Sequence, residues 1–176
     1  MRFQETPLAG AYVIEPERFP DERGFFARTF CAREFAEKGL DPRVSQTNLS
    51  YNARRGTLRG MHYQKPPHAE AKLVRCTRGA VHDVIIDLRP GSPTLHGHFA
   101  VHLDAENRTM LYIPEGFAHG FLTLTDDTEV CYQMSAAYSP EHGAGVRYDD
   151  PAFGIVWPEP VRVIAERDRT YPDVRR

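Results

Sequence analysis

Short segments in which polar and apolar side chains alternate recur through the middle of this chain. A two-residue period places successive side chains on opposite faces of a strand, so each segment is predicted to be a half-buried β-strand. Gly, Pro, Asn or Asp marks most of their ends. The segments are residues 44–52, 71–79, 80–90, 97–104, 108–116, 118–126 and 128–136. Strands at such regular spacing predict an antiparallel sandwich or barrel.

A helical pattern is clear in only one segment. Residues 31–40 place Phe35 and Leu40 among helix formers, and Gly39 is suited to end the helix. After Pro140 the chain is rich in proline and glycine, and the strand pattern weakens until residues 161–165. We expect this tail to pack over the mouth of a barrel or against a second subunit, where a buried carboxylate would reach a site. The predicted fold is therefore all-β with a few short helices.

The whole-chain properties limit the class of protein. A length of 176 residues predicts one domain, residues 1–176, or a subunit completed by its dimer. The net charge of -2 argues against a nucleic-acid partner. No apolar run reaches the ~18 residues that span a bilayer, and the N-terminus lacks the layout of a signal peptide. The cysteines are an odd number with no close pair, which predicts free thiols in the cytoplasm. They are Cys31, Cys76 and Cys131.

Residues 114–121, PEGFAHGF, contain the pattern P-x-G-x-x-H. Pro114 and Gly116 shape a turn between two strands, and His119 then points into a barrel. This pattern resembles the second conserved block of the cupin superfamily.

The first cupin block normally supplies a metal with an H-x-H pair followed by a glutamate. The corresponding residues 59–72 contain His62, His68 and Glu70 but no H-x-H pair. Spacing alone leaves open a metal site formed by His62, Glu70 and His119. The missing pair favours a protein without a metal, and we predict neither metal nor cofactor.

Further motifs follow one another along almost the whole chain. In chain order they are DERGFF (21–26), LRGMHYQ (58–64), AKLVRC (71–76), YSPE (138–141), DPAFGIVWP (150–158) and ERD (166–168). With these motifs the chain resembles the dTDP-4-dehydrorhamnose 3,5-epimerase family. The resemblance implies a cupin-type antiparallel jelly-roll barrel that forms a homodimer by sharing N-terminal strands. It also implies a metal-free isomerase that acts on a nucleotide-linked 4-keto-6-deoxyhexose in deoxysugar biosynthesis.

The candidate catalytic residues fit the chemistry of that reaction. Epimerisation next to a ketone needs a base, a group that stabilises the enolate, and an acid on the opposite face. His62 is a suitable base because the ordinary pKa of histidine is about 6.5. The family pattern implies Asp168 as the partner of His62 and Tyr132 as the proton donor. Lys72 is a candidate for holding the C4 oxyanion.

Each candidate also has a structural interpretation. Tyr132 would be barrel packing, Lys72 an exposed strand residue, and Asp168 a turn cap. His119 either binds the C4 oxygen or is a structural histidine. The remaining strand and loop histidines are interpreted as structural by default. These are His82, His96, His98, His102 and His142.

Substrate binding is assigned to arginines, amides and an aromatic ring. Arg23 and Arg59 match family arginines near the diphosphate, whose charge suits guanidinium groups. Gln46 and Asn48 offer amide hydrogen bonds to a base or ribose, and Tyr138 matches a tyrosine that stacks on the base. The structural interpretation is a solvated charge for each arginine and a turn for each amide.

The chain departs from the family pattern at residue 28. Arg28 stands where members commonly have glutamate, and a guanidinium suits the acceptor edge of cytosine better than the N3–H of thymine. A dTDP-sugar is the first expectation, and CDP- or GDP-sugars stay open. A second departure, Ala136 and Ala137 before Tyr138, bears on whether C3, C5 or both are epimerised. A metal-dependent cupin and a non-catalytic sugar-nucleotide-binding protein are the alternatives of another class.

Overall fold

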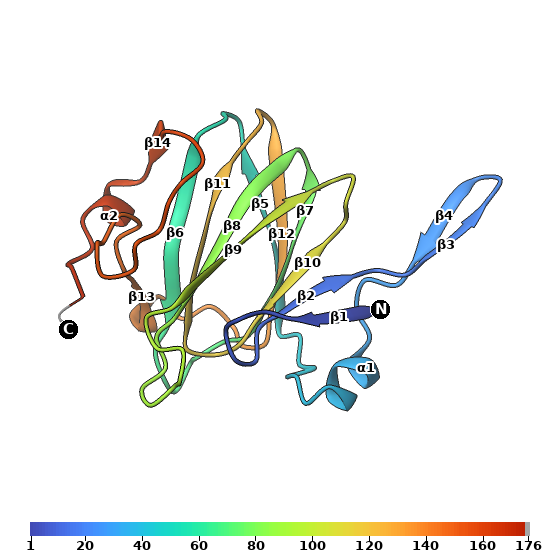
Figure 1. Ribbon diagram of the computed structural model, residues 1–176, viewed down its shortest axis with the longest axis horizontal. Coiled ribbons are helices and arrows are strands. Elements are labelled where there is room, and N and C mark those ends of the chain that lie inside the picture. The colour runs from blue at the N-terminus through green and yellow to red at the C-terminus, as the bar shows by residue number, and fades with distance from the viewer. Residues whose placement is uncertain (175–176) are drawn as a thin grey trace.

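Two β-sheets face each other in the computed structural model, which describes residues 1–174 (Figure 1). Neighbouring strands are antiparallel, except that β14 pairs in parallel with β6. In spatial order, the first sheet contains β1 (Arg2–Glu5), β2 (Tyr12–Glu15), β10 (Met110–Ile113), β7 (Lys72–Arg78), β12 (Thr128–Met134) and β5 (Gln46–Asn52). The second contains β13 (Gly143–Gly145), β6 (Thr57–Gln64), β11 (Phe117–Thr123), β8 (Ala80–Asp87) and β9 (His98–Asp104), with β14 (Val163–Ile164) on β6. This arrangement confirms the predicted all-β antiparallel jelly roll.

The main core fills the space between the two sheets, because alternate side chains of each strand point inward. Its centre is formed by Val74, Ile85, Leu111, Phe121 and Val130. Burying such a side chain fully contributes ~1.5–3 kcal/mol each. Toward one end of the barrel, inward positions of the same strands carry polar side chains instead, such as Lys72 on β7 and His119 on β11.

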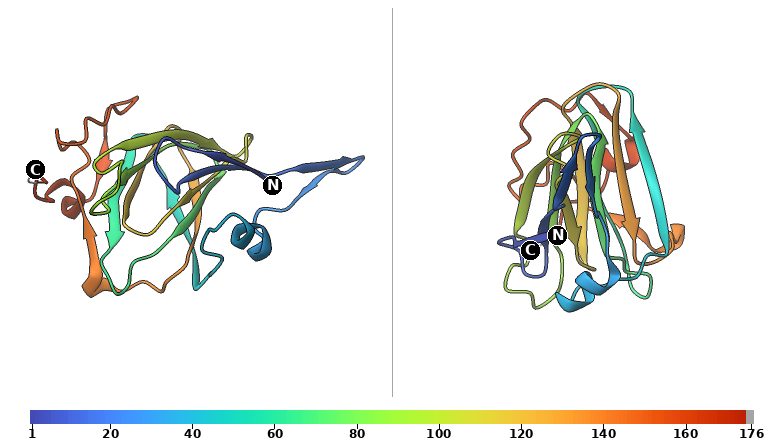
Figure 2. Two further views of the ribbon diagram at one scale, coloured as in Figure 1. Left: turned by 60° about the horizontal axis from the view of Figure 1, so that its bottom comes forward. Right: turned by 90° about the vertical axis from the view of Figure 1, so that its right-hand side faces the viewer.

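Two smaller clusters attach peripheral segments to the barrel. The first lies under α1 (Ala32–Glu37), where Phe35 packs edge-on against Tyr112 with ring centroids 5.8 Å apart. The second joins the outer face of the second sheet to the tail, where Phe153 and Trp157 pack with Val84. Figure 2 shows the tail running beside β6; this part of the tail packs on the outer face of the second sheet, whereas the sequence pattern suggested the mouth of the barrel or a second subunit.

The hairpin β3 (Arg18–Asp21) and β4 (Gly24–Ala27) projects away from the barrel (Figure 1). We call residues 18–27 the arm. The rings of Phe19, Phe25 and Phe26 on the arm are exposed to solvent.

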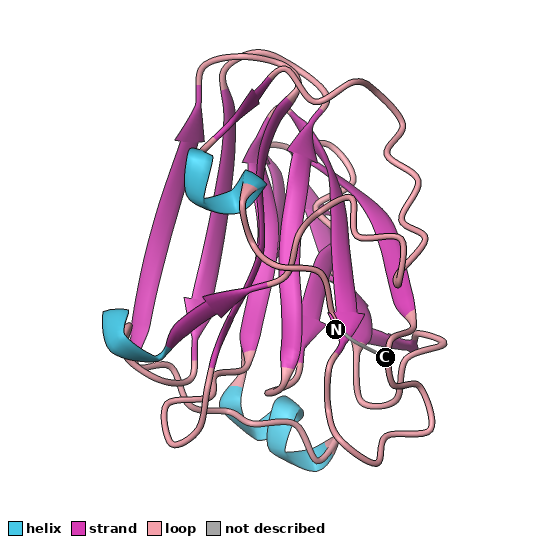
Figure 3. Cartoon of the chain, turned by 90° about the vertical axis from the view of Figure 1, so that its left-hand side faces the viewer, coloured by secondary structure: helices cyan, strands magenta, loops and turns pink. Residues whose placement is uncertain are grey.

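Each predicted strand overlaps an observed strand, and the observed strand is usually shorter; β11 begins one residue before its predicted range. The predicted helix is α1, and Gly39 follows it with a left-handed φ of 71°. The sequence did not predict the arm, the strands β1, β2, β6 and β13, the 3₁₀ helix η1 (Pro140–His142) or α2 (Glu166–Arg169). The helices are short pieces in connecting segments, as Figure 3 shows. The three cysteines are free, and no helix among residues 1–174 is long and apolar enough to cross a membrane.

Candidate active site

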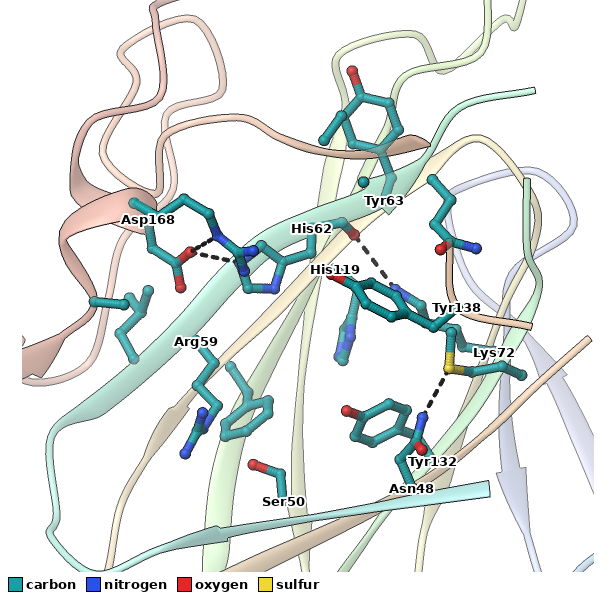
Figure 4. A pocket seen from close by; sticks show the side chains of 18 of the residues that line it. Asn48, Ser50, Arg59, His62, Tyr63, Lys72, His119, Tyr132, Tyr138 and Asp168 are labelled. Carbon is teal, nitrogen blue, oxygen red and sulfur yellow. Dashed lines mark hydrogen bonds and ion pairs between the residues drawn. The ribbon is translucent and has the colours of Figure 1, made fainter. Parts of the chain in front are cut away.

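A cavity of about 780 Å³ opens between the two sheets, a size that suits a small-molecule ligand. One wall is formed by β5, β7 and β12, and the other by β6 and β11 together with α2 of the tail (Figure 4). Nine of the eleven predicted site residues line this cavity. They are Gln46, Asn48, Arg59, His62, Lys72, His119, Tyr132, Tyr138 and Asp168.

A bulge in β6 brings two of these side chains to the same wall. Arg59 lies opposite Phe121 and His62 lies opposite His119, and the register shifts between the two pairs. Residues three apart on a regular strand point to opposite faces, so the bulge is what lets both line the cavity. The site of the bulge is Gly60, where a Cβ atom would lie 2.6 Å from the Cα of Gly120. Only glycine fits this close approach.

His62 forms a hydrogen-bonded pair with Asp168 of α2. The distance from His62 Nε2 to Asp168 Oδ1 is 2.7 Å, and the backbone N–H of Gly60 donates to Oδ2 at 3.3 Å. Burial raises the pKa of Asp168, but the hydrogen bond and charge of His62, the Gly60 N–H and the charge of Arg167 outweigh it, so this pKa lies below its usual range. An ionised carboxylate only accepts hydrogen bonds, so Nε2 carries the proton and donates it. The other ring nitrogen, Nδ1, is then left as the proton acceptor.

Tyr132 on β12 and Lys72 on β7 enter the cavity from the sheet that faces β6, the strand that carries His62 (Figure 4). Burial raises the pKa of Tyr132, so its phenol keeps its proton at neutral pH. Lys72 Nζ lies 3.0 Å from Glu70 Oε1 and 3.5 Å from the backbone oxygen of His62. The cavity therefore has a proton acceptor on one wall, and a protonated phenol and a cation opposite it.

His119 forms a second histidine–aspartate pair. Its Nε2 lies 3.0 Å from both carboxylate oxygens of Asp83 on β8. Sequence analysis left open a metal site made of His62, Glu70 and His119. Residues 1–174 contain no group of three or more His, Cys, Asp or Glu side chains placed to hold a metal ion, so these three do not form such a set. The donor set does not fit a bound metal.

The predicted binding residues on the barrel are held by local hydrogen bonds. Arg59 donates from Nε to Asn52 Oδ1 at 2.7 Å, which fixes its guanidinium at the cavity edge. Gln46 Nε2 donates to Asn48 Oδ1 at 3.1 Å, and Gln46 Oε1 accepts from the backbone N–H of Tyr138 at 2.9 Å. These side chains form a polar rim beside the half-exposed ring of Tyr138.

Arg23 and Arg28 lie outside the cavity of their own chain. Arg23, on the arm, pairs with Asp21 at 2.6 Å. Arg28 follows the arm and pairs with Glu34 of α1 at 2.9 Å. A role for either arginine in this chain's own cavity does not fit the structure, because neither residue lines the cavity: Arg23 lies on the arm, and Arg28 is paired with α1.

Sequence reasoning missed several residues that line the cavity. Tyr171 lies edge-on to His62 with ring centroids 6.3 Å apart, and the guanidinium of Arg167 approaches His62 Nε2 to 3.4 Å. Glu70 was considered only as a metal ligand. Arg167 stands directly before Asp168 in the ERD motif and Glu70 lies two residues before Lys72, so neighbourhood in the sequence was the available signal.

Comparison with known proteins agrees with this fold and identifies the family. The family model for dTDP-4-dehydrorhamnose 3,5-epimerase matches residues 5–176. A dTDP-4-dehydrorhamnose 3,5-epimerase of Sinorhizobium fredii is 44% identical over 175 residues, covering 99% of this chain and 90% of the relative.

Two solved structures add detail to the comparison. The dTDP-4-dehydrorhamnose 3,5-epimerase of Bacillus anthracis with TDP and PPi bound has a TM-score of 0.94 and 39% identity, covering 98% of this chain and 99% of the other. A 3′-monoepimerase from Streptomyces bikiniensis in complex with dTDP-quinovose has a TM-score of 0.88 and 37% identity, covering 96% and 85%.

Together the fold, the cavity and these similarities define a cupin-fold isomerase that acts on carbohydrates. More narrowly, the chain belongs to the dTDP-4-dehydrorhamnose 3,5-epimerase family.

Proposed function

We propose that this protein epimerises a nucleotide-linked 4-keto-6-deoxyhexose, with dTDP as the nucleotide, in deoxysugar biosynthesis. The observation that carries the proposal is the His62–Asp168 pair on one wall of the cavity, with Tyr132 and Lys72 on the other. A proton acceptor and a proton donor on opposite walls are what inversion of a carbon next to a ketone requires.

In the proposed mechanism, Nδ1 of His62 removes the proton from the carbon next to the ketone. Asp168 holds the ring in the required tautomer and stabilises the imidazolium that forms. Negative charge then develops on the C4 oxygen, where the ammonium of Lys72 stabilises it. The phenol of Tyr132 donates a proton from the opposite side, which inverts the carbon.

We also propose where the rest of the substrate binds. Arg59 at the cavity edge suits the diphosphate, and Gln46, Asn48 and Tyr138 form the polar and aromatic rim that would receive the nucleoside. The bound TDP of the Bacillus anthracis relative and the dTDP-sugar of the Streptomyces bikiniensis relative support a thymidine nucleotide.

The protein is proposed to work as a homodimer in the cytoplasm. Arg23 and Arg28 reach a substrate only if the arm enters the cavity of a second copy. The exposed aromatic rings of the arm and the exposed Leu49 and Tyr51 on the edge strand β5 support such an association, because exposed apolar side chains favour burial against a partner. The three free cysteines support a reducing compartment.

Solvent deuterium tests the proposed reaction. The protein is incubated in D₂O with dTDP-4-keto-6-deoxyglucose and, separately, with its CDP and GDP counterparts, and exchange is followed by NMR. We expect deuterium next to the ketone with the dTDP-sugar. Exchange at C3 alone or at C5 alone would identify a single-carbon epimerase, and a preference for another nucleotide would correct the base. If the protein binds these sugar nucleotides but none of the three shows exchange, the proposal that it is an epimerase is contradicted.

A further inference from the structure

Glu70 is a buried carboxylate in the cavity wall to which the proposed mechanism assigns no role. It lies two residues before Lys72, and its side chain is only 5% exposed. Its Oε1 atom pairs with Lys72 Nζ at 3.0 Å. Its other oxygen, Oε2, is buried and has no hydrogen-bond partner among residues 1–174.

An oxygen of this kind is costly to leave without a donor. A carboxylate accepts several hydrogen bonds, and a buried acceptor without any costs about 1–3 kcal/mol, and more when it is charged. The side-chain amide of Gln64 and the backbone N–H of Ala71 are already used by other acceptors. Gln64 Nε2 donates to the backbone oxygens of His68 and Ala137, and the N–H of Ala71 donates to Ser135 Oγ.

The cavity is where a donor for this oxygen can come from, because Glu70 lines it together with Lys72 and Tyr132. A sugar hydroxyl has the required O–H and fits a site with a single free acceptor. We propose that Glu70 is a further substrate-binding residue whose Oε2 accepts a hydrogen bond from a hydroxyl of the hexose. This inference rests on the proposed function.

The position of Lys72 identifies the hydroxyl. Lys72 faces the C4 oxygen in the proposed mechanism, and Glu70 is bonded directly to Lys72. The free oxygen therefore lies close to the ketone, so its partner is the hydroxyl on an adjacent carbon. Of the two adjacent carbons in a 4-keto-6-deoxyhexose, C5 carries a methyl group and C3 carries a hydroxyl. Glu70 thus recognises the C3 hydroxyl.

This contact makes Glu70 a determinant of specificity. A sugar without the C3 hydroxyl leaves the buried carboxylate unpaired, and sites built to bind a hydroxyl reject analogues that lack it. The same carboxylate holds the Lys72 ammonium in place, so one residue couples recognition of C3 to the position of the C4 oxygen.

The test compares Glu70→Gln with the wild-type protein on two substrates, dTDP-4-keto-6-deoxyglucose and its 3-deoxy analogue. Deuterium exchange is measured at C5, which both substrates share. For the wild type we expect kcat/KM to favour the hydroxylated substrate by about 30-fold, as for one charge-assisted hydrogen bond. In Glu70→Gln this preference should fall about tenfold, mainly through KM, while inhibition by dTDP stays unchanged. Glu129→Gln, the same change on β12 outside the cavity, is the matched control and should behave like the wild type.

Equal losses on both substrates, or weaker inhibition by dTDP, would overturn the inference, because Glu70 would then only shape the cavity. A wild-type preference that persists in Glu70→Gln would overturn it as well.

Calorimetry separates failure of the role of Glu70 from failure of the proposed function, since a binding measurement needs no turnover. Wild-type protein should bind dTDP-glucose more tightly than dTDP, and Glu70→Gln should lose about tenfold of that difference even if neither protein catalyses exchange. An unchanged difference contradicts the role of Glu70 on its own.

Discussion

Two histidine–aspartate pairs lie side by side in this protein, and they differ in what surrounds them. His62 on β6 and His119 on β11 are directly opposite each other in the second sheet. In each pair Nε2 lies within hydrogen-bond distance of a carboxylate, 2.7 Å from Asp168 Oδ1 and 3.0 Å from both oxygens of Asp83. The His62 side chain is 31% exposed, whereas that of His119 is 9% exposed.

The comparison shows that the pair alone does not make a base. Asp83 reaches His119 from the neighbouring strand β8 and is fully buried, so this pair is part of the rigid barrel. Asp168 reaches His62 from the tail, about a hundred residues away in sequence, and leaves the ring open to the cavity. A base must contact its substrate, and the accessible imidazole of His62 meets that requirement better.

The largest expected effect is on turnover when the two histidines are replaced in turn. His62→Asn removes the base and should lower kcat by about 10³-fold, within the range of general-base catalysis. His119→Asn removes either a group that binds the C4 oxygen of the substrate or a structural contact of the barrel. In both cases it should lower kcat only about tenfold. NMR of the epimerised product gives both rates, and circular dichroism controls for folding. If the two variants are folded and lose kcat equally, the distinction between a catalytic His62 and a non-catalytic His119 is wrong.

The two aspartates should separate activity from stability. Asp168→Asn should lower kcat by about 10²-fold, because the carboxylate, which is ionised at neutral pH, no longer orients the His62 ring. Asp83→Asn should lower kcat less than tenfold and the free energy of unfolding by about 1–3 kcal/mol, since it disrupts a buried hydrogen-bonded pair. Urea titration and steady-state rates measure the two quantities. The reverse pattern, with Asp83→Asn the more damaging to turnover, would show that the catalytic pair has been misassigned.

A third histidine without an aspartate partner gives the smallest effect. His82 Nε2 is buried with no hydrogen-bond partner among the described residues, and the ring packs edge-on to Trp157 at 5.9 Å. Burial lowers the pKa of His82, and the nearby His98 and His102 act in the same direction against Asp83. The unfolded chain therefore binds this proton more readily, so the contribution to stability is complete above about pH 6.5 and is lost as the pH falls below it.

Thermal melts at pH 7.5 and pH 5.5 measure this effect. The decrease in Tm on acidification should be roughly 1–2 °C smaller for His82→Gln than for the wild type. His68→Gln, at an exposed position whose charge does not act on His82, serves as the control. An identical pH dependence of Tm in the wild type and His82→Gln would show that protonation of His82 is not coupled to folding.

The sequence predicted those parts of the fold that have a local pattern. Strands that bury one face alternate polar and apolar residues, and this alternation predicted most of the strands from residue 44 onward. The arm was missed because its residues are exposed on both faces, so no alternation marks them. β6 was missed because the bulge at Gly60 interrupts its period. The short helix α2 has four residues, too few for a helical period to appear.

The residues of the site were predicted mainly from motif resemblance, but the geometry of the site was not predicted. That His62 and Asp168 meet depends on the path of the tail across β6, which no local pattern encodes. Arg23 and Arg28 were assigned by motif alone, and the structure places them beyond the reach of their own cavity. The partner of His119 was likewise invisible, because Asp83 reaches it through the pairing of β8 with β11, strands that are distant in sequence.

The most direct test of the central claim separates removal of the proton from its return. His62→Asn and Tyr132→Phe are each incubated in D₂O with excess dTDP-4-keto-6-deoxyglucose, and the recovered sugar is analysed by NMR. If His62 is the base and Tyr132 the acid, Tyr132→Phe should incorporate deuterium into sugar of unchanged configuration, because His62 takes and returns the proton on one face. His62→Asn should show no incorporation while still binding dTDP. Incorporation by His62→Asn at the wild-type rate would contradict the assignment of His62 as the base.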